Sequence, residues 1–212
     1  MFSKYFAPLA LLALAACANR RGEFDETGGI QSVRTPCPAV AIPASTGDIT
    51  LFTPPASTDA RAIDVQAIIT NLRSECTPGS TDVATNATFD VVATRRDTGP
   101  ARDVVLPYFV VVMQGGDTVV AKRVNRVLVR FEAGQARATA RAGGASSVSA
   151  AAANLPQEVI EKLTRRRKAN DPDASIDPLA APDVRRAVNR STFELLVGFQ
   201  LTADQLRYNA TR

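Results

Sequence analysis

The side chains able to do chemistry in this sequence are few, and they include no histidine. This absence excludes Ser-His-Asp and Cys-His catalytic arrangements, histidine-containing zinc sites and a histidine pH switch. Serines are plentiful and Lys162 could act as a base, but no local spacing predicts a Ser-Lys dyad. We therefore expect no catalytic residue, no cofactor and a protein that is not an enzyme.

Acidic and hydroxyl side chains recur at every second position in Asp171, Asp173, Ser175 and Asp177, a spacing that can converge oxygen ligands on calcium. The sixth position of such a loop requires glycine, and the sequence has Ile176 there. The twelfth position, where a bidentate glutamate belongs, is Pro182. The pattern therefore predicts a polar, turn-rich loop and no metal site.

A basic run comprises Arg165, Arg166, Arg167 and Lys168. It could contact an acidic partner or an anionic membrane surface, where each cation contributes about 1 kcal/mol. Cations at the end of a helix also complement the helix dipole and often just face water. Both interpretations stay open on the sequence alone.

The three cysteines come next, and the first ends an apolar segment near the N-terminus. Lys4 is followed by a run of 11 residues, 6–16, that is apolar apart from Pro8. A bilayer-spanning helix needs about 20 residues, so this length fits the hydrophobic region of a secretory signal. Leu14-Ala15-Ala16-Cys17 closes the run. One interpretation of this segment is an ordinary secretory signal in which the cysteine is a coincidence.

These four residues resemble the lipobox of bacterial lipoproteins. The resemblance implies that residues 1–16 are removed as a signal peptide and that Cys17, the new N-terminus, carries the lipid. Several acyl chains anchor a protein stably, whereas one does not. Ala18 stands where an aspartate often means inner-membrane retention, so the resemblance favours the outer membrane, with the protein facing the periplasm.

With Cys17 assigned to lipid by that resemblance, Cys37 and Cys76 are the pair that remains. Exported compartments are oxidising, so we expect a Cys37–Cys76 disulfide. Metal-binding or free thiols are the alternative, and a metal would need further ligands nearby.

Removal of the signal leaves 196 residues with 24 basic and 21 acidic side chains. This mild balance does not favour a nucleic-acid partner. Residues 17–36 are polar and predict a flexible tether with a span of about 25 Å. Residues 37–212 are long enough for a single domain with a sizeable core.

Alternating apolar residues predict strands over 62–76, 87–93, 104–113, 118–131 and 192–200. We expect a bulge near Asn71, a kink near Asn125, and an edge or break at Pro107. Residues 136–153 are rich in Ala, Ser and Gly and predict at most a weak edge strand. The fold class that follows is a mainly β protein, an antiparallel β-sandwich of immunoglobulin-like Greek-key topology. One amphipathic helix is expected before the last strand, within an insertion at about 155–191, and residues 183–189 predict a short second helix.

These features predict a non-enzymatic structural or protein-interaction module of the cell envelope. It would contact the membrane through its lipid and bind another envelope protein. The alternative is a small-molecule or lipid-binding module with a ligand cavity between the sheets. A hydrolase that uses carboxylates alone has no feature in its favour.

Overall fold

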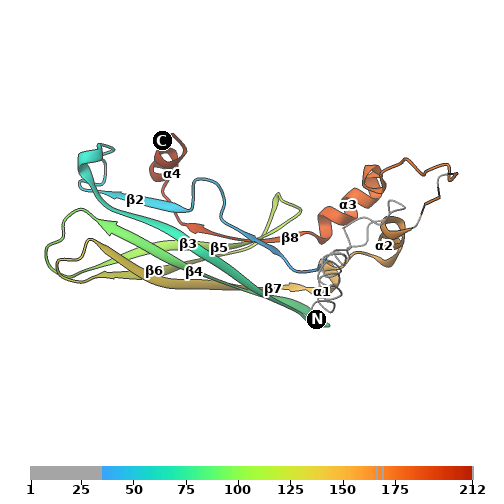
Figure 1. Ribbon diagram of the computed structural model, residues 1–212, viewed down its shortest axis with the longest axis horizontal. Helices are drawn as coiled ribbons and strands as arrows, with labels where there is room; N and C mark the ends of the chain where they lie inside the picture. The colour runs from blue at the N-terminus through green and yellow to red at the C-terminus, as the bar shows by residue number, and fades with distance from the viewer. Residues whose placement is uncertain (1–34, 166, 169, 212) are drawn as a thin grey trace, which may run out of the picture.

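The computed structural model describes residues 35–165, 167–168 and 170–211. The predicted signal peptide, Cys17 and nearly all of the tether lie outside these residues. Figure 1 shows two stacked sheets that form an elongated body, with most of the helices gathered beyond one end. The mainly β prediction and the β-sandwich are confirmed.

Each sheet has four strands. The order in the first sheet is β2 (Asp48–Phe52), β3 (Ile63–Pro78), β4 (Asp82–Arg95) and β7 (Arg137–Ser149). The order in the second is β1 (Ala39–Ala41), β8 (Phe193–Phe199), β5 (Arg102–Gln114) and β6 (Thr118–Phe131). The α-helices are α1 (Ala150–Ala153), α2 (Gln157–Thr164), α3 (Pro182–Ser191) and α4 (Ala203–Thr211), and two 3₁₀ turns are η2 (Ala60–Ala62) and η3 (Pro178–Ala180).

The connections follow a Greek-key path, because the β5–β6 hairpin in one sheet is enclosed by β4 and β7, which pair in the other. One pair departs from the predicted antiparallel pattern: β1 runs parallel to β8, with Val40 opposite Leu195. The chain then crosses to the other sheet through a turn in which the Thr46 amide donates to Pro43 O. A Cβ on Gly198 would lie 2.4 Å from Thr46 Oγ1, so this crossing needs a glycine in β8.

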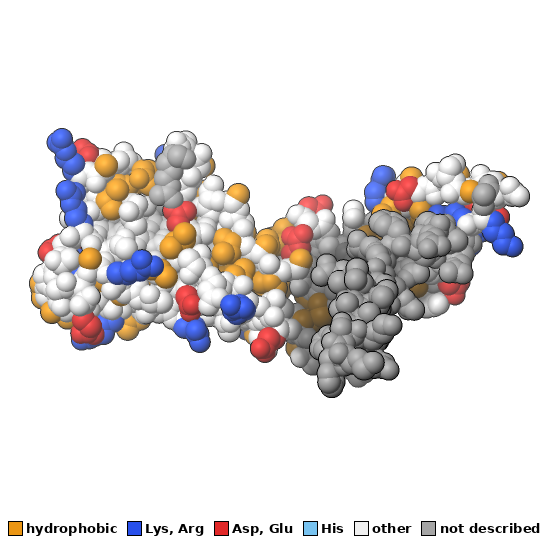
Figure 2. Space-filling view, viewed as in Figure 1, with side chains coloured by type: hydrophobic (Ala, Val, Ile, Leu, Met, Phe, Trp, Pro, Cys, Tyr) orange, Lys and Arg blue, Asp and Glu red, His pale blue; other side chains and the backbone are white. Residues whose placement is uncertain are grey.

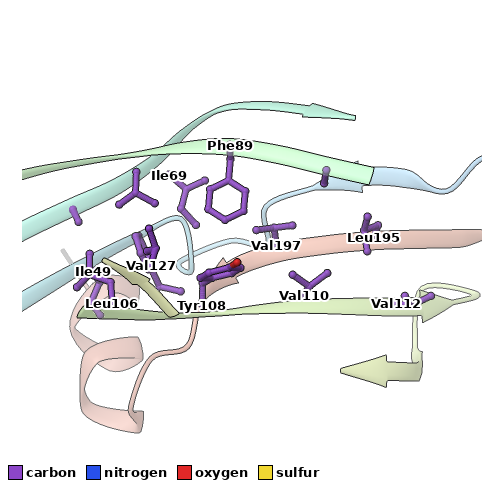
Figure 3. Packing of buried hydrophobic residues seen from close by; sticks show 14 of the residues in the cluster. Ile49, Ile69, Phe89, Leu106, Tyr108, Val110, Val112, Val127, Leu195 and Val197 are labelled. Atoms are coloured by element: carbon purple, nitrogen blue, oxygen red, sulfur yellow. The ribbon is translucent and has the colours of Figure 1, made fainter. Parts of the chain in front are cut away.

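The core lies between the sheets and follows from the alternation within the strands. In β4, Val83, Ala87, Phe89, Val91 and Ala93 are buried while most of the residues between them face outward. Burying a phenylalanine contributes about 1.5–3 kcal/mol, and Phe89, Phe131 and Phe199 are all fully buried. Figure 3 shows this packing around Tyr108, whose ring meets Phe89 edge-to-face at 5.3 Å. The Tyr108 hydroxyl donates to Gly143 O at 2.8 Å, so its polar end is satisfied.

Strand β7 is longer and better paired than the sequence predicts. It pairs with β4 from Arg137 to Ser149 without interruption. Its inward side chains are small, and a Cβ on Gly144 would lie 2.5 Å from Val110 Cγ2 of β5. The small residues therefore let β7 approach the opposite sheet closely. This close packing depends on Val110 of another strand, so the local sequence of β7 does not reveal it.

The predictions for local irregularities had mixed outcomes. The bulge near Asn71 is confirmed, because the β3–β4 register shifts between Thr70 and Arg73. The kink near Asn125 is wrong, since the irregularity of this hairpin falls between Val112 and Met113.

At Pro107 the predicted break is wrong, because β5 is continuous and pairs with β6 along its whole length. The predicted edge is confirmed, because pairing with β8 begins only at Tyr108. Pro107 O accepts from the Gln200 amide just beyond the last β8 pair, Tyr108 with Phe199. The nitrogen of an antiparallel residue points to the same side as its carbonyl. The proline therefore removes no hydrogen bond from the β5–β6 ladder, and the donor that it lacks would face Gln200, beyond the last β5–β8 pair.

The insertion before β8 contains two α-helices, α2 and α3, which lie where the amphipathic helix and the short second helix were predicted. They bury a small apolar cluster of their own, made of Val159, Val184 and Ala187. Lys162 Nζ and Asp183 Oδ2 join the two helices at 2.7 Å. The Thr202–Gln205 capping box forms at the start of α4, with reciprocal bonds of 2.9 and 3.2 Å.

Candidate functional site

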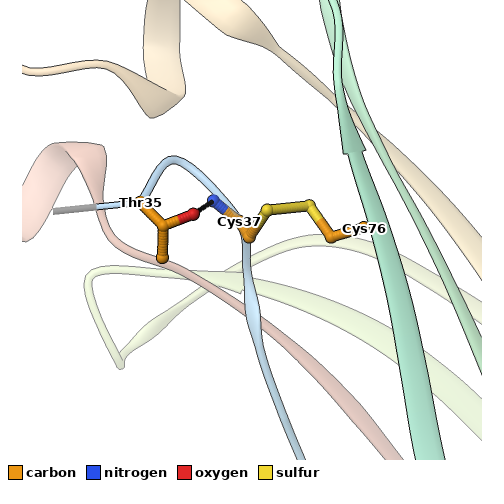
Figure 4. Close-up of a disulfide and its surroundings, with 3 residues drawn as sticks. All are labelled: Thr35, Cys37 and Cys76. Carbon is orange, nitrogen blue, oxygen red and sulfur yellow. Dashed lines mark hydrogen bonds between the residues drawn. A yellow bond between two sulfur atoms is a disulfide. The ribbon is translucent and has the colours of Figure 1, made fainter.

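The Cys37–Cys76 disulfide is confirmed, with the two Cα atoms 6.0 Å apart. Figure 4 shows it joining the segment before β1 to the far end of β3, with the Cys37 amide donating to Thr35 Oγ1 at 3.2 Å. The covalent link therefore fixes the chain to the sandwich just where residues 17–36 would lead into it.

The disulfide lies at the end of the sandwich that carries the helical insertion. Cys76 pairs with Thr85 near the start of β4, and the Ala150 amide of α1 donates to Thr81 O at 2.8 Å. Helices α1, α2 and α3 follow at this end (Figure 1). We call it the tethered end, because the predicted tether would enter the domain here, and define it by Cys37, Cys76 and helices α1–α3.

The basic run follows α2 within the insertion, and its arginines are partly neutralised. Arg165 pairs with Asp173, and Arg167 Nε lies 3.6 Å from the same carboxylate. The Arg167 side chain is 19% exposed, whereas that of Arg165 is 54% exposed. Arg166 lies outside the described residues. Contact of this run with a membrane or an acidic partner stays a prediction, and Asp173 would compete with either.

The acids of the Asp171–Asp177 segment accept hydrogen bonds or face arginines within the insertion. Asp173 faces the two arginines, Asp171 Oδ2 accepts from the Lys168 amide at 3.0 Å, and Asp177 Oδ1 accepts from the Leu179 amide at 2.9 Å. Among the described residues, no three metal-ligating side chains cluster.

Arg95 is a buried residue that the sequence analysis did not single out. Its guanidinium donates to four backbone carbonyls, those of Gly99, Pro100, Glu132 and Gln135, and lies 5.2 Å from the centroid of the Phe131 ring. It is 5% exposed. The sequence contains a signal for this burial. Every second side chain of β4 points inward, and Arg95 continues the series Phe89, Val91 and Ala93. The contacts show a structural role: Arg95 joins the loop after β4 to the turn after β6.

An ion pair links the two sheets at the end of the sandwich that lies opposite the disulfide. Arg102 donates to both carboxylate oxygens of Asp64, at 2.7 and 2.6 Å. The hydrogen bond from the Arg102 guanidinium holds the pKa of the Asp64 carboxyl below its usual value. The charged form of Asp64 is therefore favoured in the folded protein.

Replacing Asp64 by Asn is expected to reduce the sensitivity of the protein to acid. Because the folded pKa of Asp64 lies below the unfolded value of about 3.9, its contribution is present above that value and is lost as the pH falls through the folded pKa. Between about pH 6 and about pH 3, the melting temperature of wild type should then fall by more than that of Asp64→Asn. At about pH 6 the cost should be about 1 kcal/mol or less, since Arg102 is 43% exposed.

Asp204→Asn is the matched control for this experiment, because Asp204 forms an exposed pair with Arg207 at 2.9 Å within α4. Its acid sensitivity should equal that of wild type. Equal decreases in melting temperature for wild type and Asp64→Asn would contradict the lowered pKa of Asp64.

A hollow of about 640 Å³ in the described surface lies between residues 42–48 and strands β3 and β4. Its lining includes Gln66, Ile68, Val92 and Thr94 together with the core residues Ala67 and Ile69. On the face shown in Figure 2, basic and acidic side chains are interspersed outside the grey atoms. The described surface thus offers open grooves and scattered charges.

Fold and contacts together define a disulfide-bonded β-sandwich domain with a helical insertion at its tethered end. No family model matches the chain, and no curated protein or solved structure matches it either. Within the described residues, no helix is both long and apolar enough to cross a bilayer.

Proposed function

We propose that this chain is a lipid-anchored protein of the cell envelope that acts as a non-enzymatic structural or protein-interaction module. Its lipid would be carried by Cys17 in the outer membrane, with the domain facing the periplasm. The observation that carries the proposal is the Cys37–Cys76 disulfide. Such a bond is typical of exported proteins, in agreement with the resemblance of residues 14–17 to a lipobox.

The arrangement of the tethered end supports an anchored module. A tether over residues 17–36 would span about 25 Å and enter the domain at Cys37. Helices α2 and α3 lie at this same end, so the insertion and its basic run would face the bilayer (Figure 1). The opposite end and the long flanks of the sandwich would remain accessible to other envelope proteins.

The packing between the sheets favours interaction through the surface over a ligand cavity. Phe89, Leu106 and Leu195 are fully buried there (Figure 3), and Phe131 and Phe199 belong to the same buried cluster. A ligand between the sheets would have to displace such side chains, each worth about 1.5–3 kcal/mol.

Replacing Cys17 by Ser tests the anchor. Incorporation of radiolabelled palmitate should disappear, and the protein should leave the membrane fraction or stay uncut, because serine cannot form the thioether to lipid. The matched control is Cys76→Ser, which removes a cysteine of the disulfide but keeps Cys17 and should leave labelling unchanged. Unchanged membrane partitioning of Cys17→Ser would refute the anchor.

The interaction role is tested on the same cells by crosslinking the membrane-bound wild type and identifying its adducts by mass spectrometry. A dominant protein adduct that is lost in Cys17→Ser is expected. Recovery of lipid or small molecules alone would contradict the proposal and favour a ligand-binding module.

A further inference from the structure

Strand β6 is a long edge strand with one side open. It spans 14 residues, and within the described part of the chain it pairs with β5 alone. All residues from Thr118 to Arg126 are exposed, on both faces of the strand. An edge of this kind presents unpaired backbone N–H and C=O groups to any extended chain that lies beside it.

The outward side chains of β6 alternate in chemistry. Val127, Val129 and Phe131 are buried, so the residues of opposite parity face outward. This β6 row is Lys122, Val124, Arg126, Leu128 and Arg130, in which cationic and apolar side chains alternate. Val124 is 54% exposed and Leu128 53% exposed, next to Val105 of β5 at 52%.

The cations of the β6 row are largely without acidic partners. Lys122 Nζ lies 5.3 Å from the centroid of the Phe109 ring, and among the described residues neither Lys122 nor Arg126 has a carboxylate within 4.0 Å. Arg130 differs, because it pairs with Asp103 at 3.3 Å and Glu132 at 3.0 Å. Two positions of the row are therefore free to bind acids.

Cations on an edge strand commonly prevent aggregation, and here they make pairing with a second copy unfavourable. That purpose alone does not call for Val105, Val124 and Leu128 to remain exposed between the cations. An added strand with acids beside Lys122 and Arg126 and apolar residues beside Val124 and Leu128 would match both features. Charge and apolar surface thus point to the same occupant.

We propose that the β6 edge binds an extended segment of a partner protein by strand addition, and that the segment alternates acidic and apolar residues along one face. This inference rests on the proposed interaction function and names the chemistry of the partner. Main-chain hydrogen bonds would provide affinity, and the β6 row would select the sequence.

The probe is a fluorescent peptide, Glu-Thr-Val-Thr-Glu-Thr-Val-Thr-Glu, which places acids and valines alternately on one face. Its binding to the purified lipidated protein is followed by anisotropy. One control peptide has the same composition with its three glutamates consecutive, and another has lysine in place of glutamate. Amide hydrogen exchange then reports whether residues 118–131 gain protection.

We expect the alternating peptide to bind at least about tenfold more tightly than either control, and to slow exchange in β6. Lys122→Glu/Arg126→Glu should weaken it by about tenfold or more. The matched variant is Arg137→Glu/Arg141→Glu, which makes the same change in charge on the neighbouring edge strand β7. It should bind like wild type, and melting curves of both variants check folding.

Equal weakening by both double variants, or binding without protection of β6, would overturn the inference in favour of general charge attraction. Binding of phosphatidylglycerol vesicles that depends on Lys122 and Arg126, without binding of the peptide, would assign the edge to a membrane surface instead. If no peptide binds while crosslinking still recovers a protein partner, the strand-addition inference fails and the proposed function stands.

Discussion

Replacing Arg95 by Met is expected to lower the free energy of unfolding by about 3 kcal/mol. Methionine keeps much of the apolar stem but removes the donors to the carbonyls of Gly99, Pro100, Glu132 and Gln135. The loop after β4 and the turn after β6 would lose the group that joins them. Urea unfolding followed by circular dichroism measures the change.

Two further substitutions separate burial from charge at this position. Arg137→Met removes an exposed arginine from the adjacent strand β7 and should cost less than about 0.5 kcal/mol. Arg95→Lys keeps the positive charge but not the planar set of donors, so its cost should be intermediate. A loss below about 1 kcal/mol in Arg95→Met would show that the four hydrogen bonds contribute little.

Replacing Cys37 by Ser is expected to cost about 4 kcal/mol, because the disulfide closes a loop with a sequence separation of 39 residues. For a domain of this size, that corresponds to a drop in melting temperature of about 10 °C. Reductant should shift the wild-type curve by a similar amount and leave the variant unchanged. Differential scanning calorimetry with and without reductant makes the comparison.

Cys76→Ser is the control, since either substitution breaks the same bond. The double variant should be no less stable than either single variant. A wild-type melting curve that does not move with reductant would contradict the predicted contribution of the disulfide.

Much of the sandwich could be predicted because local alternation directly reflects burial. Phe89 and Val91 alternate with less buried residues in β4, and Leu195 alternates with the half-buried Glu194 and Leu196 in β8. The turn between the strands predicted over 104–113 and 118–131 also suits the sequence, because Gly115 and Gly116 adopt positive φ values that glycine favours.

The features that escaped prediction depend on distant partners. Gly144 makes β7 a full strand by fitting against Val110, and Pro107 is tolerated because β8 ends beside it. The parallel β1–β8 pair joins segments more than 150 residues apart. Burial of Arg95 requires carbonyls from two separate turns. Its place on the same face of β4 as Val91 could therefore be interpreted only once the fold was known.

The disulfide also determines how the domain responds to mechanical force. Strand β1 has three residues paired with β8, and a pull on the chain before Cys37 would peel so short a strand away. The Cys37–Cys76 bond transfers that tension directly to β3, which has 16 residues and pairs along most of its length with β4. Tension along the long axis of the sandwich would then shear many hydrogen bonds at once instead of opening them one by one. A protein attached at this end could be stretched between two envelope structures without unravelling from its attached strand.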